Sequence, residues 1–329
     1  PTERWFWFDP PFHSGGSALL HRQADDIWRI DLQLGWECDP DEEKKPEHVI
    51  PRIRAMLGPD RAFELEWVSV YTFQCARLER FVHDHVMFVG DSAHQVSPFG
   101  ARGGNSGIQD ADNLCWKLAR VVRNESPEQL LQTYDDERVE AANENILNSS
   151  RSTDFITPKS SASRQMRDAV LALSHRHAFA RRLVNSGRLS TPTAHRGNTL
   201  STADRDSFAC TVAPGTPAVD APVQVAGRTV SLLDQLGGRF DLLIFDTKDG
   251  ASAALQSEFG SDLRVSRIAP EEKRGTHVLE DIEGLARRRY DADAGAVYLL
   301  RPDHYVAARW RSPSVVDVRL ALKCAQGMQ

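Results

Sequence analysis

The residues best suited to chemistry lie in one glycine-rich stretch, Gly90–Leu114, which follows a short apolar run. That run, Val86–Val89, predicts a buried parallel strand, because such strands read as continuous apolar segments. Asp91 comes directly after it, so its carboxylate is placed to accept hydrogen bonds from ligand hydroxyls. The following glycines let the backbone approach a ligand closely, and a helix N-terminus favours negative charge. The stretch therefore predicts a site for a polyol that carries an anionic group.

Two helices must follow this turn if the site is to form. Ser106 and Gln109 have the spacing of a capping box, which predicts that the first helix starts at Ser106. A second helix is predicted from Ser126-Pro127-Glu128, with Ser126 as its N-cap, to about Leu147. The apolar stripe of the first helix consists of Ile108, Ala111, Leu114, Cys115, Leu118 and Val122.

The part of the chain that precedes the glycine-rich turn has the pattern of an antiparallel sheet. Apolar and polar residues alternate from Trp28 to Trp36, which is typical of a half-buried strand. A short helix is predicted over Val49–Leu57, ended by Gly58-Pro59. The other strands predicted here are Trp5–Phe8, Ala18–Leu20 and Phe63–Phe73.

The part that follows the second helix divides in two. Residues 151–206 are rich in Ser, Arg and Asn and predict a helical connector with one or two loops. The turn Ala213–Pro217 then marks the start of a small α/β domain with a terminal hairpin. Its predicted strands are Leu242–Phe245, Leu263–Ile268, Ala296–Leu300 and Val306–Trp310.

Composition excludes several classes of protein. The 329 residues carry 40 Lys and Arg against 46 Asp and Glu, a net charge of −6, which argues against binding to nucleic acid or anionic membranes. No apolar run reaches the roughly 18 residues of a membrane span. The five cysteines never form a C-x-x-C pair, which favours a reducing cytoplasm over a disulfide framework. No metal site is expected, and His83-Asp84-His85 is interpreted as a solvated turn.

The stretch Gly90–Leu114 closely resembles the second flavin-binding motif, the "GD" motif, of the class A FAD-dependent aromatic hydroxylases. The resemblance continues through Trp116-Lys117-Leu118 and Tyr134-x-x-Glu137-Arg138. The variant Ser97–Asn105 is most similar to the larger flavoprotein monooxygenases that act on phenol or 3-(3-hydroxyphenyl)propionate. Those members carry a C-terminal thioredoxin-like domain, and the end of this chain fits that layout.

This resemblance implies a multidomain protein with α/β and α+β parts. It would contain part of a FAD-binding domain of the glutathione-reductase-like fold, a mixed-sheet substrate domain and a thioredoxin-like domain. The implied division is residues 1–80 for the remainder of the substrate-binding β-sheet domain, 81–150 for the C-terminal part of the FAD-binding domain, 151–206 for the connector and 207–329 for the thioredoxin-like domain.

The resemblance also implies roles for matched positions, although it names no catalytic residue. Asp91 would bind the ribityl–pyrophosphate part of FAD, and the helix from Ser106 would point its positive end at the flavin N1–C2=O edge. Arg102 would meet the flavin or an acidic substrate, with a surface or ion-pair role as the alternative. The residues implied to lie along the isoalloxazine ring are Pro98, Gly100, Ala101, Arg102, Gly103, Gly104 and Asn105.

The implied reaction is hydroxylation of a phenolic ring. NAD(P)H would reduce FAD, O2 would add to give a C4a-hydroperoxyflavin, and this species would transfer oxygen to the aromatic substrate. The partners would be that substrate and O2, with a homodimer left open. Two alternatives remain: a non-catalytic thioredoxin-like or scaffold fragment of such an enzyme, and a hydroxylase of a polyketide or antibiotic ring.

The chain departs from the family in lacking a G-x-G-x-x-G sequence, since Gly15-Gly16 and Gly237-Gly238 are simple doublets. The family's middle Asp-Gly motif is also absent. The aromatic beginning without Met is typical of a strand cut from a longer chain. This chain alone is expected to hold no FAD stably, because the pyrophosphate and adenosine halves of FAD rely on the missing glycine loop. Cys210 and Cys324 are expected to be redox-inert, because neither has a resolving partner nearby in sequence.

Overall fold

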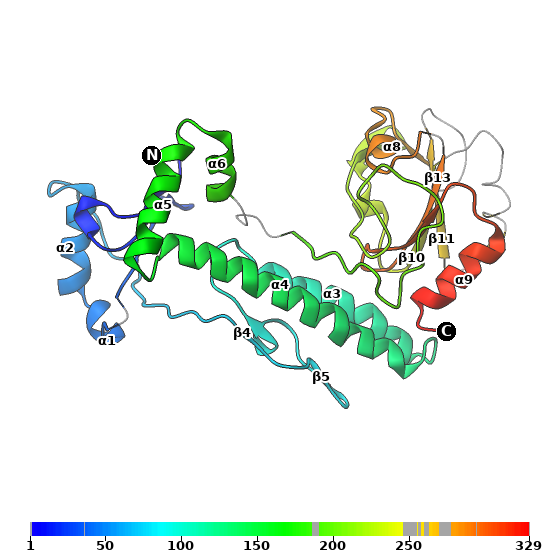
Figure 1. Cartoon of the computed structure of the whole chain (residues 1–329), viewed down its shortest axis with the longest axis horizontal. Helices are drawn as coiled ribbons and strands as arrows, with labels where there is room; N and C mark the ends of the chain where they lie inside the picture. The colour runs from blue at the N-terminus through cyan, green and yellow to red at the C-terminus, as the bar shows by residue number, and fades with distance from the viewer. Residues whose placement is uncertain are drawn as a thin grey trace. The chain divides into compact units, whose positions relative to one another are not determined.

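The computed structural model describes residues 2–35, 37–185, 191–245, 255, 258–259, 263–269, 278–293 and 295–328. Trp36, the end of the predicted period-two pattern, lies outside these residues. Figure 1 labels the helices and strands along the chain. The chain forms two compact units. The first contains residues 1–75, 96–102 and 146–189, and the second contains residues 76–95, 103–145 and 190–329.

The first unit contains a three-stranded antiparallel sheet, as the sequence predicts. Its strands are β1 (Trp5–Trp7), β2 (Ala18–Arg22) and β3 (Trp28–Leu32), with β2 in the centre. Trp5 lies opposite Leu20, and Ala18 lies opposite Leu32. Because β2 has a neighbour on both sides, its first three residues are at most 5% exposed.

The segment Phe63–Phe73 is not a strand, and that prediction is wrong. Residues 59–75 form no helix or strand, and Trp67 and Tyr71 are 79% and 70% exposed. Aromatic residues favour strands only where a neighbouring strand supplies hydrogen bonds and packing, and none of the described residues pairs with this segment. The predicted helix is present as α2 (Pro46–Leu57) and ends at Gly58, whose φ is +95°.

Helices form the rest of the first unit. A short helix, α1 (Pro40–Glu43), begins after Asp39, whose carboxylate accepts a hydrogen bond from the Asp41 N–H. The predicted connector contains α5 (Ser161–Ser174) and α6 (Ala178–Asn185). The remaining short element is the 3-10 turn η1 (Pro11–His13).

Two long helices dominate the start of the second unit. They are α3 (Gly103–Val122) and α4 (Gln132–Ile156), which run antiparallel and side by side (Figure 1). The end of α4, from Ile146, belongs to the first unit. The helix α3 begins three residues before the predicted start. The second helix begins as a 3-10 turn, η3 (Glu128–Leu131), and Ser126 does not cap it; its hydroxyl accepts a hydrogen bond from Arg120 Nε instead.

The run Val86–Val89 is not a buried parallel strand, which corrects a second prediction. Its first two residues form β6 (Val86–Met87), which pairs antiparallel with β5 (Val82–His83), and Val86 is 56% exposed. An apolar run is buried in a parallel sheet only between parallel neighbours, and the described residues supply none for this one. A second hairpin-like pair joins β4 (Ala76–Arg77) to β7 (His94–Gln95).

A seven-stranded mixed sheet forms the C-terminal part of the second unit. Its order is β14-β13-β10-β11-β12-β8-β9, in which β10 to β12 are parallel and the other pairs are antiparallel. The helices α8 and α9 and the 3-10 turn η4 (Leu233–Gln235) are among the described elements that accompany it. The elements are β8 (Pro222–Val225), β9 (Arg228–Ser231), β10 (Phe240–Phe245), β11 (Leu263–Ala269), β12 (Val278–Glu280), α8 (Leu285–Arg289), β13 (Ala296–Leu300), β14 (Val306–Trp310) and α9 (Val315–Ala325).

The central strand β10 has apolar cores on both of its faces, because successive side chains point to opposite sides. Leu243 and Phe245 belong to one core, and Leu242 and Ile244 belong to the other. The second core also includes Trp116 of α3. The sheet and α3 therefore share one hydrophobic core, and the predicted mixed α/β character is confirmed.

Candidate functional site: a glycine turn held against a helix start

The predicted cofactor turn is a 3-10 turn, η2 (Gly90–Ser92), that lies directly against α3. Gly90 has φ +57°, and a Cβ atom placed on Gly107 would stand 3.3 Å from the Gly90 Cα. A side chain at position 107 would therefore push the two backbones apart by a few tenths of an ångström. The close contact places Asp91, the next residue, beside the first turns of α3.

A buried carboxylate, Asp110 on α3, holds the turn in place. Its Oδ2 accepts hydrogen bonds from the Gly90 N–H at 3.0 Å and from His94 Nε2 at 2.7 Å. Its Oδ1 accepts one from Arg138 Nε at 2.7 Å. Burial alone raises the pKa of Asp110, but His94 and Arg138 outweigh it, so the pKa lies below its ordinary value. The turn is therefore anchored by an ionised side chain.

The side chain of Asp91 is exposed, and among the described residues it has no hydrogen bond or ion pair. Its carboxylate oxygens are thus available to accept hydrogen bonds from ligand hydroxyls, as the sequence predicts. His94 also agrees with expectation: it makes the structural hydrogen bond to Asp110, and its ring stacks on Phe81 at 5.8 Å.

The first turn of α3 is made of Gly103, Gly104 and Asn105, which the sequence placed in a loop. The first four N–H groups of an α-helix have no acceptor within the helix. No atom lies within 4 Å of the point where a Cβ of Gly104 would stand. Ser106 lies inside the helix rather than at its start, and its buried hydroxyl accepts hydrogen bonds from Arg138 Nη2 and Asn145 Nδ2.

The remaining predicted residues, Pro98 and Gly100–Arg102, belong to the first unit. The chain turns there through two consecutive residues of positive φ, Gly100 at +92° and Ala101 at +53°. Arg102 is 3% exposed, which contradicts the surface alternative for its role. The preceding Ser97 is buried and bonded to Ser149 Oγ at 2.5 Å, so this segment is fixed within its own unit.

Asp110 was missed as a site residue. The apolar stripe predicted for α3 is not its buried face, because Ile108, Leu118 and Val122 are 71%, 36% and 71% exposed. Asp110 lies on the buried face with Asn113 and Lys117, so the apolar periodicity gave no signal for it. Nothing local in the sequence specifies that its partners are Gly90 and Arg138, which are 20 and 28 positions away.

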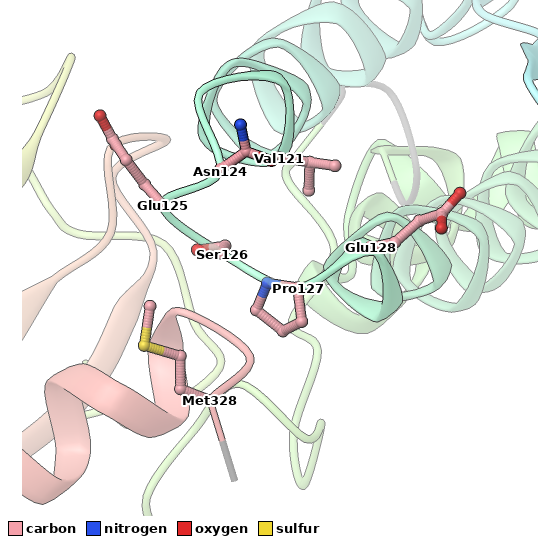
Figure 2. A pocket seen from close by; sticks show the side chains of 7 residues that line it. All are labelled: Val121, Asn124, Glu125, Ser126, Pro127, Glu128 and Met328. Atoms are coloured by element: carbon pink, nitrogen blue, oxygen red, sulfur yellow. The ribbon is translucent and has the colours of Figure 1, made fainter.

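A separate groove of about 500 Å³ lies at the other end of α3. In Figure 2 the carboxylates of Glu125 and Glu128 point away from each other, so they do not form a joint binding site. In the described part of the chain, no cluster of three or more His, Cys, Asp or Glu residues is arranged to hold a metal ion. None of the described helices is long and apolar enough to cross a membrane. The groove is lined by Val121, Asn124, Glu125, Ser126, Pro127, Glu128 and Met328.

The fold and the site agree with two protein-family models. Residues 13–149 match the family described as "FAD binding domain", and residues 215–325 match the "HcaD C-terminal domain". The first match includes the whole of the glycine turn and α3. These two parts of the chain are therefore similar to the two families, and the predicted resemblance to the flavoprotein aromatic hydroxylases is confirmed.

Comparison with individual proteins also finds aromatic hydroxylases among the relatives of this chain. The chain is 29% identical to 2,4-dichlorophenol 6-monooxygenase of Delftia acidovorans over 90% of this chain and 56% of the relative. It is 28% identical to a 3-(3-hydroxy-phenyl)propionate/3-hydroxycinnamic acid hydroxylase of Burkholderia vietnamiensis over 86% of this chain and 55% of the relative. The chain spans about half the length of the curated relatives it matches.

Solved structures show the fold. The flavin-dependent monooxygenase PieE, solved with FAD and substrate, has a TM-score of 0.67 at 23% identity, covering 97% of this chain and 59% of PieE. Aklavinone-11 hydroxylase with FAD and aklavinone has a TM-score of 0.67 at 21% identity, covering 94% and 57%.

Proposed function

We propose that the protein to which this chain belongs is an FAD-dependent monooxygenase that hydroxylates a phenolic aromatic substrate with NAD(P)H and O2. The observation that carries the proposal is the glycine turn fixed against the start of α3, with Asp91 exposed beside it. Two phenol-type hydroxylases among the relatives support the substrate class. A relative described as a probable NADH-specific resorcinol 4-hydroxylase, 40% identical over 33% of this chain and 20% of its own length, supports the nicotinamide donor.

The residues present fit FAD on two observations. An exposed carboxylate at Asp91 suits the ribityl hydroxyls, and the open space at Gly104 leaves room for a planar ring or an anionic edge against the start of α3. We assign Asp91 to the ribityl–pyrophosphate part of FAD. We assign the backbone of Pro98, Gly100, Ala101, Arg102, Gly103, Gly104 and Asn105 to the isoalloxazine ring.

FAD, when bound, supplies the transfer of electrons from NAD(P)H and the activation of O2. The residues of this chain bind and orient it. The first-turn N–H groups and the dipole of α3 favour negative charge on the flavin edge, and they need no reorganisation when that charge develops. Asp110 holds the backbone of the turn at Gly90, and so fixes the point from which the Asp91 side chain would reach the hydroxyls.

A second candidate substrate class is the fused ring of a polyketide. Its support is a relative described as 6-methylpretetramide 4-monooxygenase of Streptomyces rimosus, 28% identical over 80% of this chain and 49% of its own length. A scaffold role without catalysis is the remaining alternative.

We also infer that residues 207–329 form a thioredoxin-like domain. The support is the parallel pair β10–β11, flanked by the antiparallel hairpin β13–β14 and followed by α9. The other proposed parts remain residues 1–80, 81–150 and 151–206 as defined above. A cytoplasmic location agrees with the free thiols of all five cysteines.

The test is substrate-stimulated oxidation of NADH and NADPH by the full-length protein, with products identified by mass spectrometry. The panel should contain simple phenols, hydroxyphenyl acids and a fused polyketide ring. Addition of 16 mass units to a phenol supports the main proposal, and addition to the fused ring alone supports the second. A purified protein without flavin absorbance that oxidises neither nucleotide contradicts both.

A further inference from the structure

A buried network of charged and polar side chains joins the C-terminal sheet to α3 and α4, the helices that hold the glycine turn η2. Its centre is Glu137 of α4, which is 2% exposed. The guanidinium of Arg301, at the end of β13, binds it through two contacts, Nη1 to Oε1 at 2.5 Å and Nη2 to Oε2 at 3.0 Å. Lys117 Nζ of α3 donates to Glu137 Oε2 at 2.9 Å.

The turn after β13 contributes a second carboxylate, Asp303. It accepts hydrogen bonds from Arg301 Nε at 2.9 Å and Nη2 at 2.5 Å, and from Asn113 Nδ2 of α3 at 3.1 Å. Asn113 also donates to Glu137 at 2.7 Å. Two positive and two negative groups therefore balance in a space from which water is excluded, and each has directed hydrogen bonds.

The network continues to the glycine turn η2 through neighbouring residues on α3 and α4. Arg138 follows Glu137 on α4 and binds Asp110, which lies one helical turn before Asn113 on α3. Asp110 in turn holds the Gly90 N–H and His94. The contact between α3 and α4 thus has Arg301 and Asp303 at one end and the turn beside Asp91 at the other.

We propose that the Arg301–Asp303 turn of the C-terminal domain is a positioning element for the flavin site, acting through Glu137, Arg138 and Asp110. Trp116 of α3 lies in the same apolar core as the C-terminal sheet, so the helix and the sheet pack as one body. A change in the network at the Arg301 end therefore shifts the helices at the Gly90 end. The assignment of the Arg301–Asp303 turn to a flavin site rests on the proposed function. The coupling between this turn and Gly90 does not.

The test is hydrogen exchange of single amides in the chain, measured by NMR. The variant Arg301→Met/Asp303→Asn removes one positive and one negative charge and leaves the Lys117–Glu137 pair. We expect the amides of Gly90 and Ala93 to exchange about tenfold faster, near the lower end of the roughly 5- to 150-fold range typical of coupled sites. The amides of β10 should keep their protection.

The matched control is Glu258→Gln/Arg319→Gln, which removes an exposed ion pair of the same domain outside the network. It should leave Gly90 and Ala93 unchanged. Coupling is reciprocal, so Asp110→Asn should speed exchange of the His304 amide, which bonds to the Arg301 carbonyl at 3.0 Å. If the double variant unfolds, Arg301→Lys and Asp110→Asn provide the same two measurements.

Unchanged exchange at Gly90 in a folded Arg301 variant, or at His304 in Asp110→Asn, would overturn the proposal. FAD affinity of the full-length protein separates this result from the proposed function. Coupled exchange with a dissociation constant for FAD about tenfold higher supports both. Coupled exchange with no FAD binding in the parent protein supports the network and contradicts the proposed function.

Discussion

At the scale of single residues, Asp91 is the side chain on which the cofactor assignment depends. It is exposed, belongs to the anchored turn η2 and has no partner within the described part of the chain. A carboxylate without other partners can accept hydrogen bonds from a ligand without first breaking any.

We predict that Asp91→Ala in the full-length protein raises the dissociation constant for FAD by about one to two decades. Hydrogen bonds to a charged group contribute about 1.5–3 kcal/mol, which corresponds to that range. Fluorescence titration of the apoprotein measures it. Glu79→Ala, which removes an exposed carboxylate from the same unit, is the control and should have no effect. Equal affinities for the two variants would contradict the assignment.

Gly107 shows how one missing side chain sets the position of a turn. We predict that Gly107→Val lowers the free energy of unfolding by about 1–3 kcal/mol, because the new atoms press on Gly90 across 3.3 Å. Gly104→Ala, in the same helix but facing open space, should instead stabilise by up to about 1 kcal/mol. Urea unfolding without cofactor measures both, and unchanged stability of Gly107→Val would contradict the contact with Gly90.

At the scale of elements, sequence patterns predicted those helices and strands that are determined by residues near each other in the sequence. The strands β1, β2 and β3, the helix α2 and four strands of the C-terminal sheet, β10, β11, β13 and β14, follow from alternating patterns or apolar runs, and the structure confirms them. The short strands β8, β9 and β12 were not predicted. Phe63–Phe73 and Val86–Val89 failed for one physical reason: a strand exists only with a partner, and the pattern does not state whether one is present. The start of α3 failed because Ser106 serves α4 rather than its own helix end.

The ion pairs between α3 and α4 should make the free energy of unfolding depend on pH in the acidic range. The pKa values of Asp110 and Glu137 are lowered in the folded chain from 3.8 and 4.5: burial raises them, and the cationic partners outweigh it. The unfolded chain therefore binds more protons in this range. The stabilisation is present above the ordinary values and is lost as the pH falls through the lowered ones.

We predict that the free energy of unfolding falls between pH 5 and pH 3, by at most about 1.4 kcal/mol per pH unit for each group. Urea unfolding at half-unit steps measures the slope. Asp110→Asn should flatten it, while Asp136→Asn, an exposed residue of α4, should not. A slope that is the same in all three proteins would contradict the role given to Asp110.

At the scale of the whole molecule, we expect the thiols of Cys210 and Cys324 to have no part in the proposed reaction. Cys210 Sγ lies 3.4 Å from Arg309 Nη1 and 3.8 Å from the carbonyl of Val212, and Cys324 Sγ lies 3.2 Å from the carbonyl of Thr199. Neither has a second thiol recorded beside it, and disulfide exchange needs one.

We predict that Cys210→Ser/Cys324→Ser in the full-length protein keeps its rate of substrate hydroxylation within about twofold, since serine preserves the polar contacts. Steady-state turnover measures it, with circular dichroism to confirm folding. A folded double variant with strongly reduced turnover would show that a thiol takes part.

Trp116 gives the molecule an optical property of its own. Its ring is 9% exposed, with the Arg301 guanidinium carbon 5.6 Å and the Phe240 ring 5.6 Å from its centre. Trp5, Trp28 and Trp67 are 45%, 38% and 79% exposed, so iodide should quench their fluorescence first. The emission that survives comes largely from indoles in the sheet core, where Trp116 lies beside a cation. A shift in the emission maximum of this unquenched fluorescence would report the separation of the C-terminal sheet from α3.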